Sequence, residues 1–418
     1  MYKKARDVFV FYLEGMLKSK SHEQDVRILN DFMSEHRCLV LTRDIAKSRQ
    51  EYTNAYAIEQ WQFNLPHPAF QKHIIIDFNT RIESIIYVSD DIDFITNALG
   101  SFSKTILINP AGIQMDYGRL PDLIFRNIRG FIKALGDGYW SLFGEGLIHA
   151  PNIKQYKGNI GRTFIGDENQ PIPVIYAGRY FGSNHYRSYI DFYSMSIRKN
   201  KDKGSTLFKK FDNVFMRIFR AETLKICDLQ KIDAICSIPD HTVSENECGR
   251  FAEMTSKIAK ELSLDNIQPF LHRTTRQHSQ KSTTSAKERE KNMKDSFTFD
   301  INLYEKKVIL LDDILTSGST LREASKTLFK AGASGIICAV LGVNQFSIDY
   351  WSNDDSLLSF HETNRLTGNS KSLKPFFSNP NTNKTIDYEN AVSELYEKLN
   401  KSISSMKNPY EIDDDRLF

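Results

Sequence analysis

The chain has 418 residues, which suggests two or three domains at roughly 150 residues each. Hydrophobic residues make up 40% of the sequence and charged residues 26%, so the chain can build apolar cores and is not a mostly disordered protein. The net charge of +3 does not indicate a nucleic-acid-binding protein, and no apolar run approaches the roughly 18 residues of a membrane-spanning helix.

Residues 1–113 alternate short apolar runs with polar, helix-like segments. The runs are VFVFYL, CLVLT, HIIIDF, SIIYVS and TILIN. Short runs rich in Val and Ile are typical of buried parallel strands. The sequence therefore predicts an α/β domain with a parallel sheet over residues 1–113.

The first run is similar to motif I of the haloacid dehalogenase-like (HAD-like) hydrolases, an apolar strand followed by Asp-x-Asp-Gly-Thr-Leu. Here Tyr12 stands in place of the nucleophilic aspartate, Glu14 in place of the acid/base aspartate and Met16 in place of the threonine. The later motifs of that family are matched in order by Thr42, Lys72, Asp90, Asp91 and Asp93.

Phosphate transfer in the HAD-like family needs a carboxylate as nucleophile and as magnesium ligand. The phenol of a tyrosine, with a pKa of about 10, is a poor substitute for the carboxylate in both roles. The resemblance therefore implies a degenerate HAD-like domain that serves as a scaffold or ligand sensor. The alternative is an ordinary Rossmann-like domain that never hydrolysed phosphate, and both interpretations exclude a phosphatase.

Residues 114–172 are of mixed character. IFRNIRGFIKALG and YWSLFGEGLI resemble helices punctuated by glycine, and KGNIGRTFIGDENQPIP has the Gly, Pro and Asn content of a linker. We therefore predict a helical connector over residues 114–172.

Residues 173–350 return to an α/β pattern. LFKKFDNVFMRIFRAETLK has the apolar stripe of an amphipathic helix, and DAICSIP, KVILLDD and IICAVLGV are predicted strands. The predicted fold class is α/β, with two Rossmann-like parallel-sheet domains joined by the helical connector. Residues 351–418 are predicted to form a C-terminal extension with one helix near 387–403.

The most informative motif is VILLDDILTSGST at residues 308–320. Its apolar residues predict a buried strand that ends in Asp312 and Asp313, at the edge where open α/β sheets bind ligands. A loop of hydroxyl-bearing residues and Gly318 leads into the helix LREASKTLFKAG, an arrangement that cradles phosphate groups. The two carboxylates can grip cis-diol hydroxyls and a nearby Mg²⁺ ion.

This motif resembles the signature of type I phosphoribosyltransferases for 5-phosphoribosyl 1-diphosphate (PRPP). The resemblance implies that Asp312 and Asp313 hold the ribose hydroxyls and a magnesium ion. The residues implied to bind the 5-phosphate are Thr316, Ser317, Gly318, Ser319 and Thr320. The alternative is a generic acidic strand end followed by a polar loop.

Upstream, AICSIPDHT at residues 234–242 predicts a strand that leads into a polar turn. Such a turn can offer backbone donors to a diphosphate, and its candidate residues are Ser237, Pro239 and Asp240. The segment that follows looks like the ComF branch of the family, in which a basic Arg…Gln…Arg-x-x-Asn…Phe pattern precedes the PRPP strand. The matching residues are Arg273, Gln280, Arg289, Asn292 and Phe297.

Residues 272–294 contain seven Lys or Arg and two Glu, which gives a local charge of +5. Such a segment suits a strongly anionic leaving group. The resemblance implies catalytic roles for Arg273 and Arg289 and a diphosphate contact for Lys281. The alternatives are a solvated loop or a nucleic-acid contact.

The predicted function is that of a Mg²⁺-dependent phosphoribosyltransferase, which transfers the phosphoribosyl group of PRPP to an unknown nitrogen acceptor and releases diphosphate. The alternative is a non-catalytic PRPP- or nucleotide-sensing module, such as a stress or phage-defence effector that acts with a protein or RNA partner. Five cysteines form no CxxC pair and read as reduced thiols of a cytoplasmic protein. The sequence leaves open whether the chain forms a homo-oligomer, and no membrane partner is expected.

Overall fold

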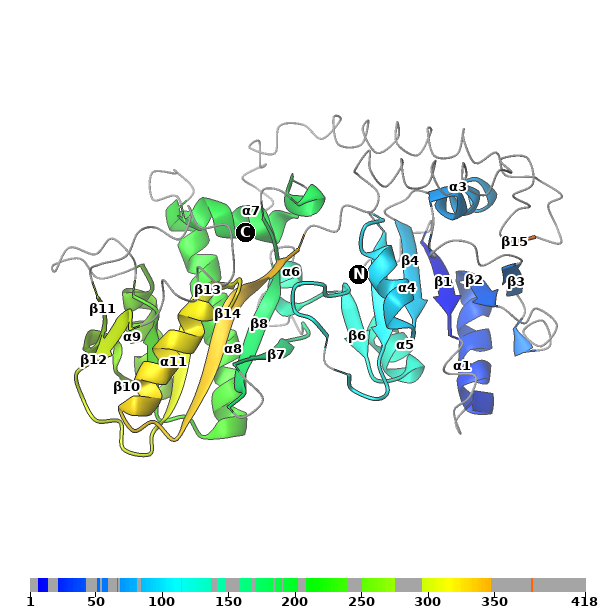
Figure 1. Cartoon of the computed structure of the whole chain (residues 1–418). Helices are drawn as coiled ribbons and strands as arrows, with labels where there is room; N and C mark the ends of the chain where they lie inside the picture. Colours follow the sequence, from blue (N-terminus) through cyan, green and yellow to red (C-terminus); the bar gives the residue numbers. More distant parts are fainter. Residues whose placement is uncertain are drawn as a thin grey trace. The chain divides into compact units, whose positions relative to one another are not determined.

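A computed structural model describes residues 7–13, 22–42, 51–52, 55–58, 66, 68–80, 84–101, 103–113, 115–136, 141–147, 158–166, 170–182, 185–189, 191–201, 208–239, 250–274, 295–346 and 377–378. These residues divide into two compact units (Figure 1). The first unit holds the described residues within 1–140 together with 185–187, 346 and 377–378. The second unit holds those within 141–182 and 188–345.

The first unit is built on a seven-stranded sheet with the order β15-β3-β2-β1-β4-β5-β6. Its strands are β1 (Val8–Tyr12), β2 (Arg37–Thr42), β3 (Ala55–Ile58), β4 (Ile85–Ser89), β5 (Lys104–Ile108), β6 (Leu123–Phe125) and β15 (Phe377–Ser378). All neighbouring pairs are parallel except β15 and β3. The parallel sheet predicted for this part of the chain is therefore confirmed.

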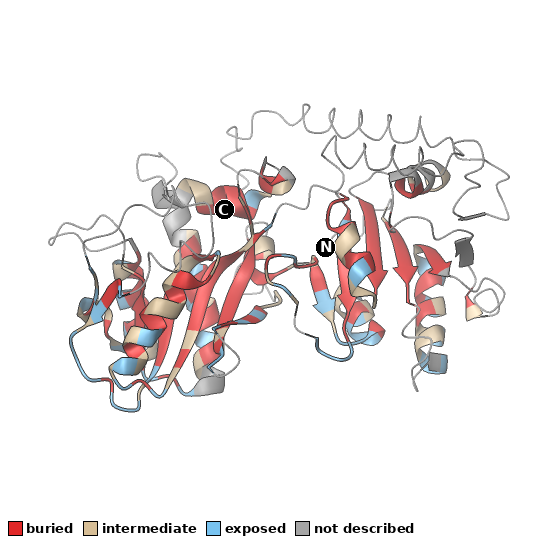
Figure 2. Cartoon of the chain, in the orientation of Figure 1, coloured by how far each residue is buried: buried red, intermediate tan, exposed pale blue. Residues whose placement is uncertain are grey.

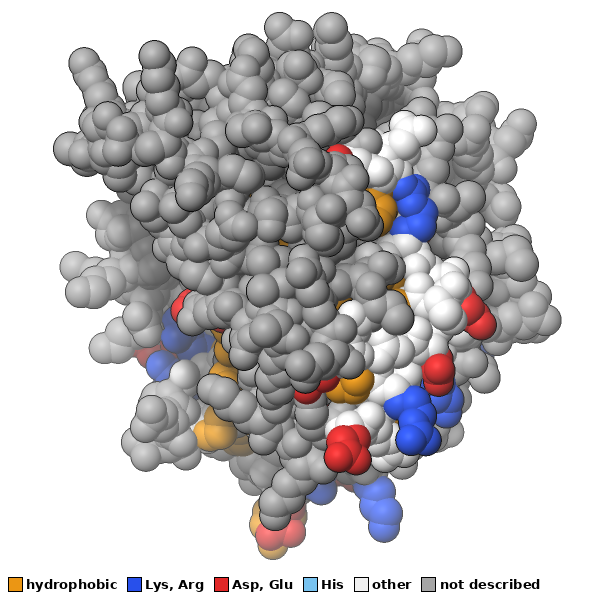
Figure 3. Space-filling model, turned by 90° about the vertical axis from the view of Figure 1, so that its right-hand side faces the viewer, with side chains coloured by type: hydrophobic (Ala, Val, Ile, Leu, Met, Phe, Trp, Pro, Cys, Tyr) orange, Lys and Arg blue, Asp and Glu red, His pale blue; other side chains and the backbone are white. Residues whose placement is uncertain are grey.

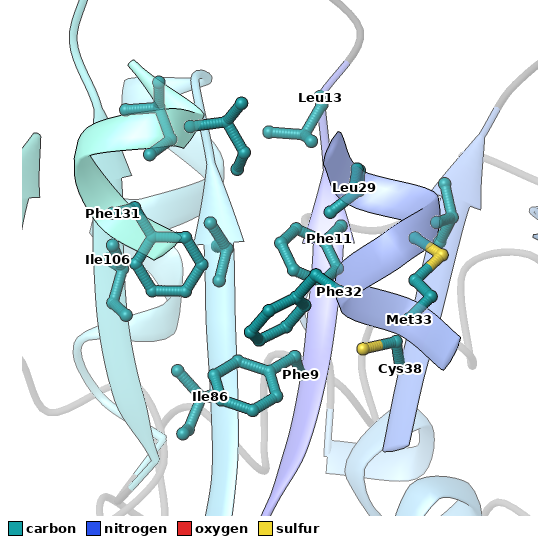
Figure 4. Close-up of a cluster of buried hydrophobic side chains, with 14 of the residues drawn as sticks. Phe9, Phe11, Leu13, Leu29, Phe32, Met33, Cys38, Ile86, Ile106 and Phe131 are labelled. Atoms are coloured by element: carbon teal, nitrogen blue, oxygen red, sulfur yellow. The ribbon is translucent and has the colours of Figure 1, made fainter. Parts of the chain in front are cut away.

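Helices cover both faces of the first sheet. They are α1 (His22–Glu35), α3 (Pro68–Asp77), α4 (Ile92–Ala98) and α5 (Ile128–Gly136). Alternate residues of β1 belong to opposite apolar clusters, because successive side chains of a strand point to opposite faces. Val10 and Tyr12 pack with residues of α3 and α4, whereas Phe9 and Phe11 pack with residues of α1 and α5 (Figure 4).

The run HIIIDF corrects one expectation, because its pattern predicts a strand and all of it except the final Phe78 lies in helix α3. Phe70 and Ile74 are one helical turn apart, and both are buried in the same apolar cluster. Pro68 is the first residue of the helix, where its fixed φ angle and missing N–H group are tolerated. The helical spacing of the buried residues therefore outweighs the β-branched run.

The second unit is built on a six-stranded sheet with the order β10-β9-β13-β14-β8-β7. Its strands are β7 (Gly161–Ile165), β8 (Ile172–Phe181), β9 (Ala234–Ser237), β10 (Asp265–Asn266), β13 (Lys307–Leu315) and β14 (Gly335–Gln345). Only β7 is antiparallel to its neighbour in this sheet. The strands predicted from DAICSIP, KVILLDD and IICAVLGV are confirmed as β9, β13 and β14.

The helices of the second unit are α6 (Phe143–Leu147), α7 (Phe192–Lys201), α8 (Phe208–Gln230), α9 (Arg250–Leu262) and α11 (Ser319–Lys330). Helix α11 packs on β13 and β14, and α8 and α9 lie behind the sheet in Figure 1. The central strands are buried along most of their length (Figure 2). A separate antiparallel ribbon pairs β11 (Leu271–Arg273) with β12 (Phe297–Phe299). Short 3-10 turns are η4 (Tyr186–Tyr189) and η5 (Gln268–Phe270).

The stretch predicted as a helical connector contains α5 and α6, and it also contributes a strand to each sheet. β6 pairs with β5, and β7 pairs with β8. Residues of β7 alternate between buried and exposed positions, which is the pattern of a half-buried strand. The helix predicted near 387–403 lies outside the described residues.

No helix of the described part of the chain combines the length and the apolar character that a membrane crossing requires. On the face shown in Figure 3, acidic and basic side chains of the described residues lie interspersed.

Candidate functional site

Strand β13 carries the two predicted carboxylates near its carboxyl end. Asp312 and Asp313 are half-buried, and the strand continues past them to Leu315, which pairs with Val343 of β14. The strand therefore runs longer than the sequence predicted, because the buried residues Ile314 and Leu315 extend the pairing. The Oδ1 atom of Asp312 accepts a hydrogen bond from the Asp313 N–H group at 2.8 Å.

A tight turn follows β13 and starts helix α11. Gly318 adopts the left-handed conformation with φ 74°, which favours glycine because it has no Cβ. The Gly318 carbonyl accepts the hydrogen bond of Arg322 N–H at 2.8 Å, so the first turn of the helix is formed. The hydroxyls of Ser317 and Ser319 lie 2.9 Å apart. Hydroxyls gathered at the N-terminus of a twelve-residue helix form a site suited to a phosphate group.

Arg322 is a residue of this site that sequence reasoning missed. It is half-buried, and its Nη2 atom lies 3.5 Å from the Ser317 carbonyl oxygen. The guanidinium therefore adds positive charge beside the turn. The signal was its position four residues after Gly318, because residues one helical turn apart share a face.

The end of β9 lies beside the end of β13. Ser237 is in register with Leu311, and the Ile238 N–H group donates to the Leu311 carbonyl oxygen at 2.9 Å. The side chain of Gln268 accepts hydrogen bonds from both the N–H and the hydroxyl of Ser237, the latter at 2.6 Å. Pro239 is half-buried. Asp240, the third candidate of this turn, lies outside the described residues.

The ribbon β11–β12 places two residues of the basic segment opposite each other. Arg273 pairs with Phe297, and the Arg273 guanidinium lies 5.1 Å from the centroid of the Phe297 ring. The remaining predicted residues of that segment lie outside the described residues, namely Gln280, Lys281, Arg289 and Asn292.

Two buried cysteines lie in the strands on either side of β13, Cys236 in β9 and Cys338 in β14. Burial raises the pKa of the Cys338 thiol to about 12, the Asp312 carboxylate adds to the rise, and a hydrogen bond with Ser325 opposes it. Burial likewise raises the pKa of the Cys236 thiol well above its ordinary value. Because the thiolate is the reactive form, neither thiol is available for covalent catalysis.

The residues at this edge offer part of the oxygen ligand set that a magnesium ion needs. Asp312 and Asp313 supply carboxylate oxygens, the ligand type that Mg²⁺ prefers, and Mg²⁺ is usually bound through one or two carboxylates together with substrate phosphates. Within the described ranges, no group of three or more His, Cys, Asp and Glu side chains could hold a metal ion. The donor set therefore suits a metal that arrives with an anionic substrate.

The described residues of the HAD-like pattern lie in the first unit, and each has a different environment. Tyr12 is buried, and its ring lies 4.9 Å from that of Phe94 in an apolar cluster. Asp91 caps helix α4 by accepting the Phe94 N–H at 3.0 Å, and Asp93 is exposed. Of the other matched residues, Asp90 is half-buried, Thr42 ends β2, Lys72 lies in α3, and Glu14 and Met16 lie outside the described residues.

The model of the phosphoribosyl transferase domain matches residues 248–355. The match supports a type I phosphoribosyltransferase domain in this part of the chain. Competence protein F from Haemophilus influenzae (strain ATCC 51907 / DSM 11121 / KW20 / Rd) is 33% identical over 86 residues. That alignment covers 20% of this chain and 37% of the relative, so the chain matches little more than a third of the relative's length.

Similar solved structures include a dehalogenase with intermediate complex and an uncharacterized protein from Corynebacterium glutamicum ATCC 13032 Kitasato. Their TM-scores are 0.24 and 0.23, each at 10% identity. They cover 28% and 31% of this chain and 55% and 93% of their own chains. The HAD-like assignment of the first unit stays a prediction.

Proposed function

We propose that residues 173–350 form a Mg²⁺-dependent phosphoribosyltransferase, which transfers the phosphoribosyl group of PRPP to a nitrogen acceptor and releases diphosphate. The observation that carries the proposal is the succession of two half-buried carboxylates, a left-handed glycine turn and a helix N-terminus at the end of β13. The matched phosphoribosyl transferase domain includes this succession.

In the proposed reaction, Asp312 and Asp313 hold the ribose hydroxyls and the magnesium ion. The turn from Thr316 to Thr320 binds the 5-phosphate, with Arg322 as an added cation. Catalysis comes from positioning the two reactants and from stabilising charge, without a covalent nucleophile. When bound, Mg²⁺ neutralises part of the charge that develops on the departing diphosphate.

The diphosphate is assigned to the end of β9 and to the basic segment. The proposed contacts are Pro239, Asp240, Arg273, Lys281 and Arg289. Ser237 holds the end of β9 in place, because its N–H and hydroxyl groups both donate to Gln268. The first unit is proposed to act as a scaffold or sensor, since Tyr12 replaces the carboxylate that phosphate transfer needs.

The test measures binding and turnover separately. Isothermal titration with PRPP and Mg²⁺ should give saturable binding that D312N weakens at least tenfold, because the amide loses the charge that holds the metal and the hydroxyls. The matched control is D300N, since Asp300 is an exposed carboxylate of the same unit that pairs with His272. Absence of PRPP binding by the wild-type chain would refute the proposal.

Diphosphate release is then assayed against a panel of nitrogen bases. Release with one acceptor, lost in D312N and kept in D300N, supports a transferase. Binding of PRPP without release for any acceptor would instead favour the non-catalytic PRPP-sensing module.

A further inference from the structure

One hydrogen-bond acceptor fixes the end of β9. Ser237 is buried, and its N–H and hydroxyl groups both donate to Gln268 Oε1. The next residue is also held, because Ile238 N–H donates to the Leu311 carbonyl oxygen of β13. The direction in which the chain leaves β9 is therefore set by β13 and by Gln268.

Gln268 itself is held firmly. Its N–H group donates to Asn266 Oδ1 at 3.1 Å, and the preceding Ile267 N–H donates to the Ile235 carbonyl oxygen of β9 at 3.1 Å. Ile267 is also buried. The side chain of Gln268 therefore meets Ser237 from a backbone that is already hydrogen-bonded to the same strand.

The turn η5 that starts at Gln268 leads directly into the ribbon β11–β12, and that ribbon is tied to α11. The Asp295 N–H group donates to Glu323 Oε1 at 2.8 Å, and Thr327 Oγ1 donates to the Phe297 carbonyl oxygen at 3.5 Å. These two hydrogen bonds reach α11 at Glu323 and Thr327, beyond its first turn, and include neither Ser237 nor Gln268.

We propose that Gln268 is a positioning residue for diphosphate recognition, acting through Ser237 on the chain that leaves β9. This inference rests on the proposed function. Gln268 does not touch the ligand. It holds Ser237 and Pro239 in the orientation that presents the end of β9 to the diphosphate, whereas the 5-phosphate turn is set independently by Gly318 and α11.

If the hydrogen bonds between Ser237 and Gln268 served only the stability of the fold, a different result would be expected. Removal of Oε1 leaves two buried donors without an acceptor, which destabilises a protein at any location. Loss of stability alone therefore does not separate the two roles. A selective loss of diphosphate affinity separates the two roles, because the 5-phosphate turn shares no residue with the Ser237–Gln268 contact.

The experiment measures the binding of two probes to the full chain by isothermal titration in the presence of Mg²⁺. The probes are inorganic diphosphate and ribose 5-phosphate. In Gln268→Met, which removes the acceptor at similar volume, we expect the Kd for diphosphate to rise about tenfold. The Kd for ribose 5-phosphate should stay within about twofold of the wild type. Gln268→Glu keeps an acceptor for both donors and should bind diphosphate better than Gln268→Met.

The matched control is Gln71→Met. Gln71 is a buried glutamine of the first unit that donates to the Ser101 carbonyl oxygen and to Ser103 Oγ. This control should leave both Kd values unchanged although it also removes buried hydrogen bonds. If Gln268→Met does not fold, Gln268→Asn replaces it, because its shorter side chain withdraws the acceptor while keeping the amide.

Equal effects of the Gln268 substitution on both probes, or no effect on either, would overturn the inference. Failure of the proposed function is recognised separately, because the wild-type chain would then bind neither probe.

Discussion

Glu222 of α8 offers a test of the second unit's core that is independent of any ligand. Its side chain is 2% exposed, and neither carboxylate oxygen has a hydrogen-bond partner among the described residues. Burial raises the pKa of Glu222 to about 8, while the positive charges of Lys225 and Arg162 oppose the rise. Among the described residues, Lys225 Nζ lies 3.9 Å from Oε1, and the Lys225 side chain is 43% exposed.

The sign of the resulting pH dependence follows from this raised pKa. Below pH 4.5, the pKa of glutamate in the unfolded chain, Glu222 is protonated in both the folded and the unfolded chain. Its titration then does not change the free energy of unfolding. Between pH 4.5 and about 8 the unfolded chain loses the proton and the folded chain keeps it, so the free energy of unfolding falls as the pH rises. At 1.36 kcal/mol per pKa unit, the rise corresponds to a ceiling of about 5 kcal/mol.

The substitution E222Q imitates the protonated acid at every pH. We expect it to match the wild type to within about 1 kcal/mol at pH 5 and to be more stable at pH 9, by up to about 5 kcal/mol. The assay is hydrogen exchange of peptides from α8 and β13 in a urea series at pH 5, 7 and 9, because these peptides report on the second unit alone.

The control is E253Q, since Glu253 of α9 is exposed and pairs with Lys257. An exposed pair contributes little, so its removal should leave the stability nearly unchanged. The reasoning is refuted if E222Q lowers the stability equally at all three pH values. That result would mean that Glu222 is ionised and paired with Lys225 in the folded chain.

Three further predictions concern other parts of the molecule. G318A should lower the free energy of unfolding by about 1–2 kcal/mol, because alanine at φ 74° carries the cost of the left-handed conformation, and urea denaturation of the second unit measures it. F131A should cost the first unit about 3–5 kcal/mol through the cavity left among the surrounding rings, while PRPP affinity stays unchanged in the same titration as above. Cys236 and Cys338 should resist a thiol reagent in the native chain, because burial raises the pKa of both thiols, and mass spectrometry of labelled peptides before and after urea unfolding checks this.

Local patterns predicted strands β1, β2, β4, β5, β9, β13 and β14, because an apolar run and its polar borders are neighbours in the sequence. The run around Leu310 is apolar and bounded by a polar turn, so its burial as a strand follows directly. The β-branched run from Ile74 to Ile76 favours a strand locally, whereas the fold buries Phe70 and Ile74 on one side of helix α3.

Contacts between distant segments could not be predicted in this way. Gln268 meets Ser237 across 31 residues of sequence, and no local pattern marks either residue as a partner of the other. Strand β7 was obscured for a related reason. Its glycine and the surrounding Gly, Pro and Asn residues resemble a linker, and only pairing with β8 makes Gly161–Ile165 a strand.

The interior position of β13 bears on how this protein can be redesigned. The strand has neighbours on both sides, β9 and β14, whereas β10 and β7 form the two margins of the sheet. A shift of β13 by one residue would change its pairing with both neighbours and move each of its side chains to the opposite face of the sheet. Substitutions that probe the proposed transferase should therefore leave the pairing of β13 untouched, and insertions belong in surface loops, where they cost little.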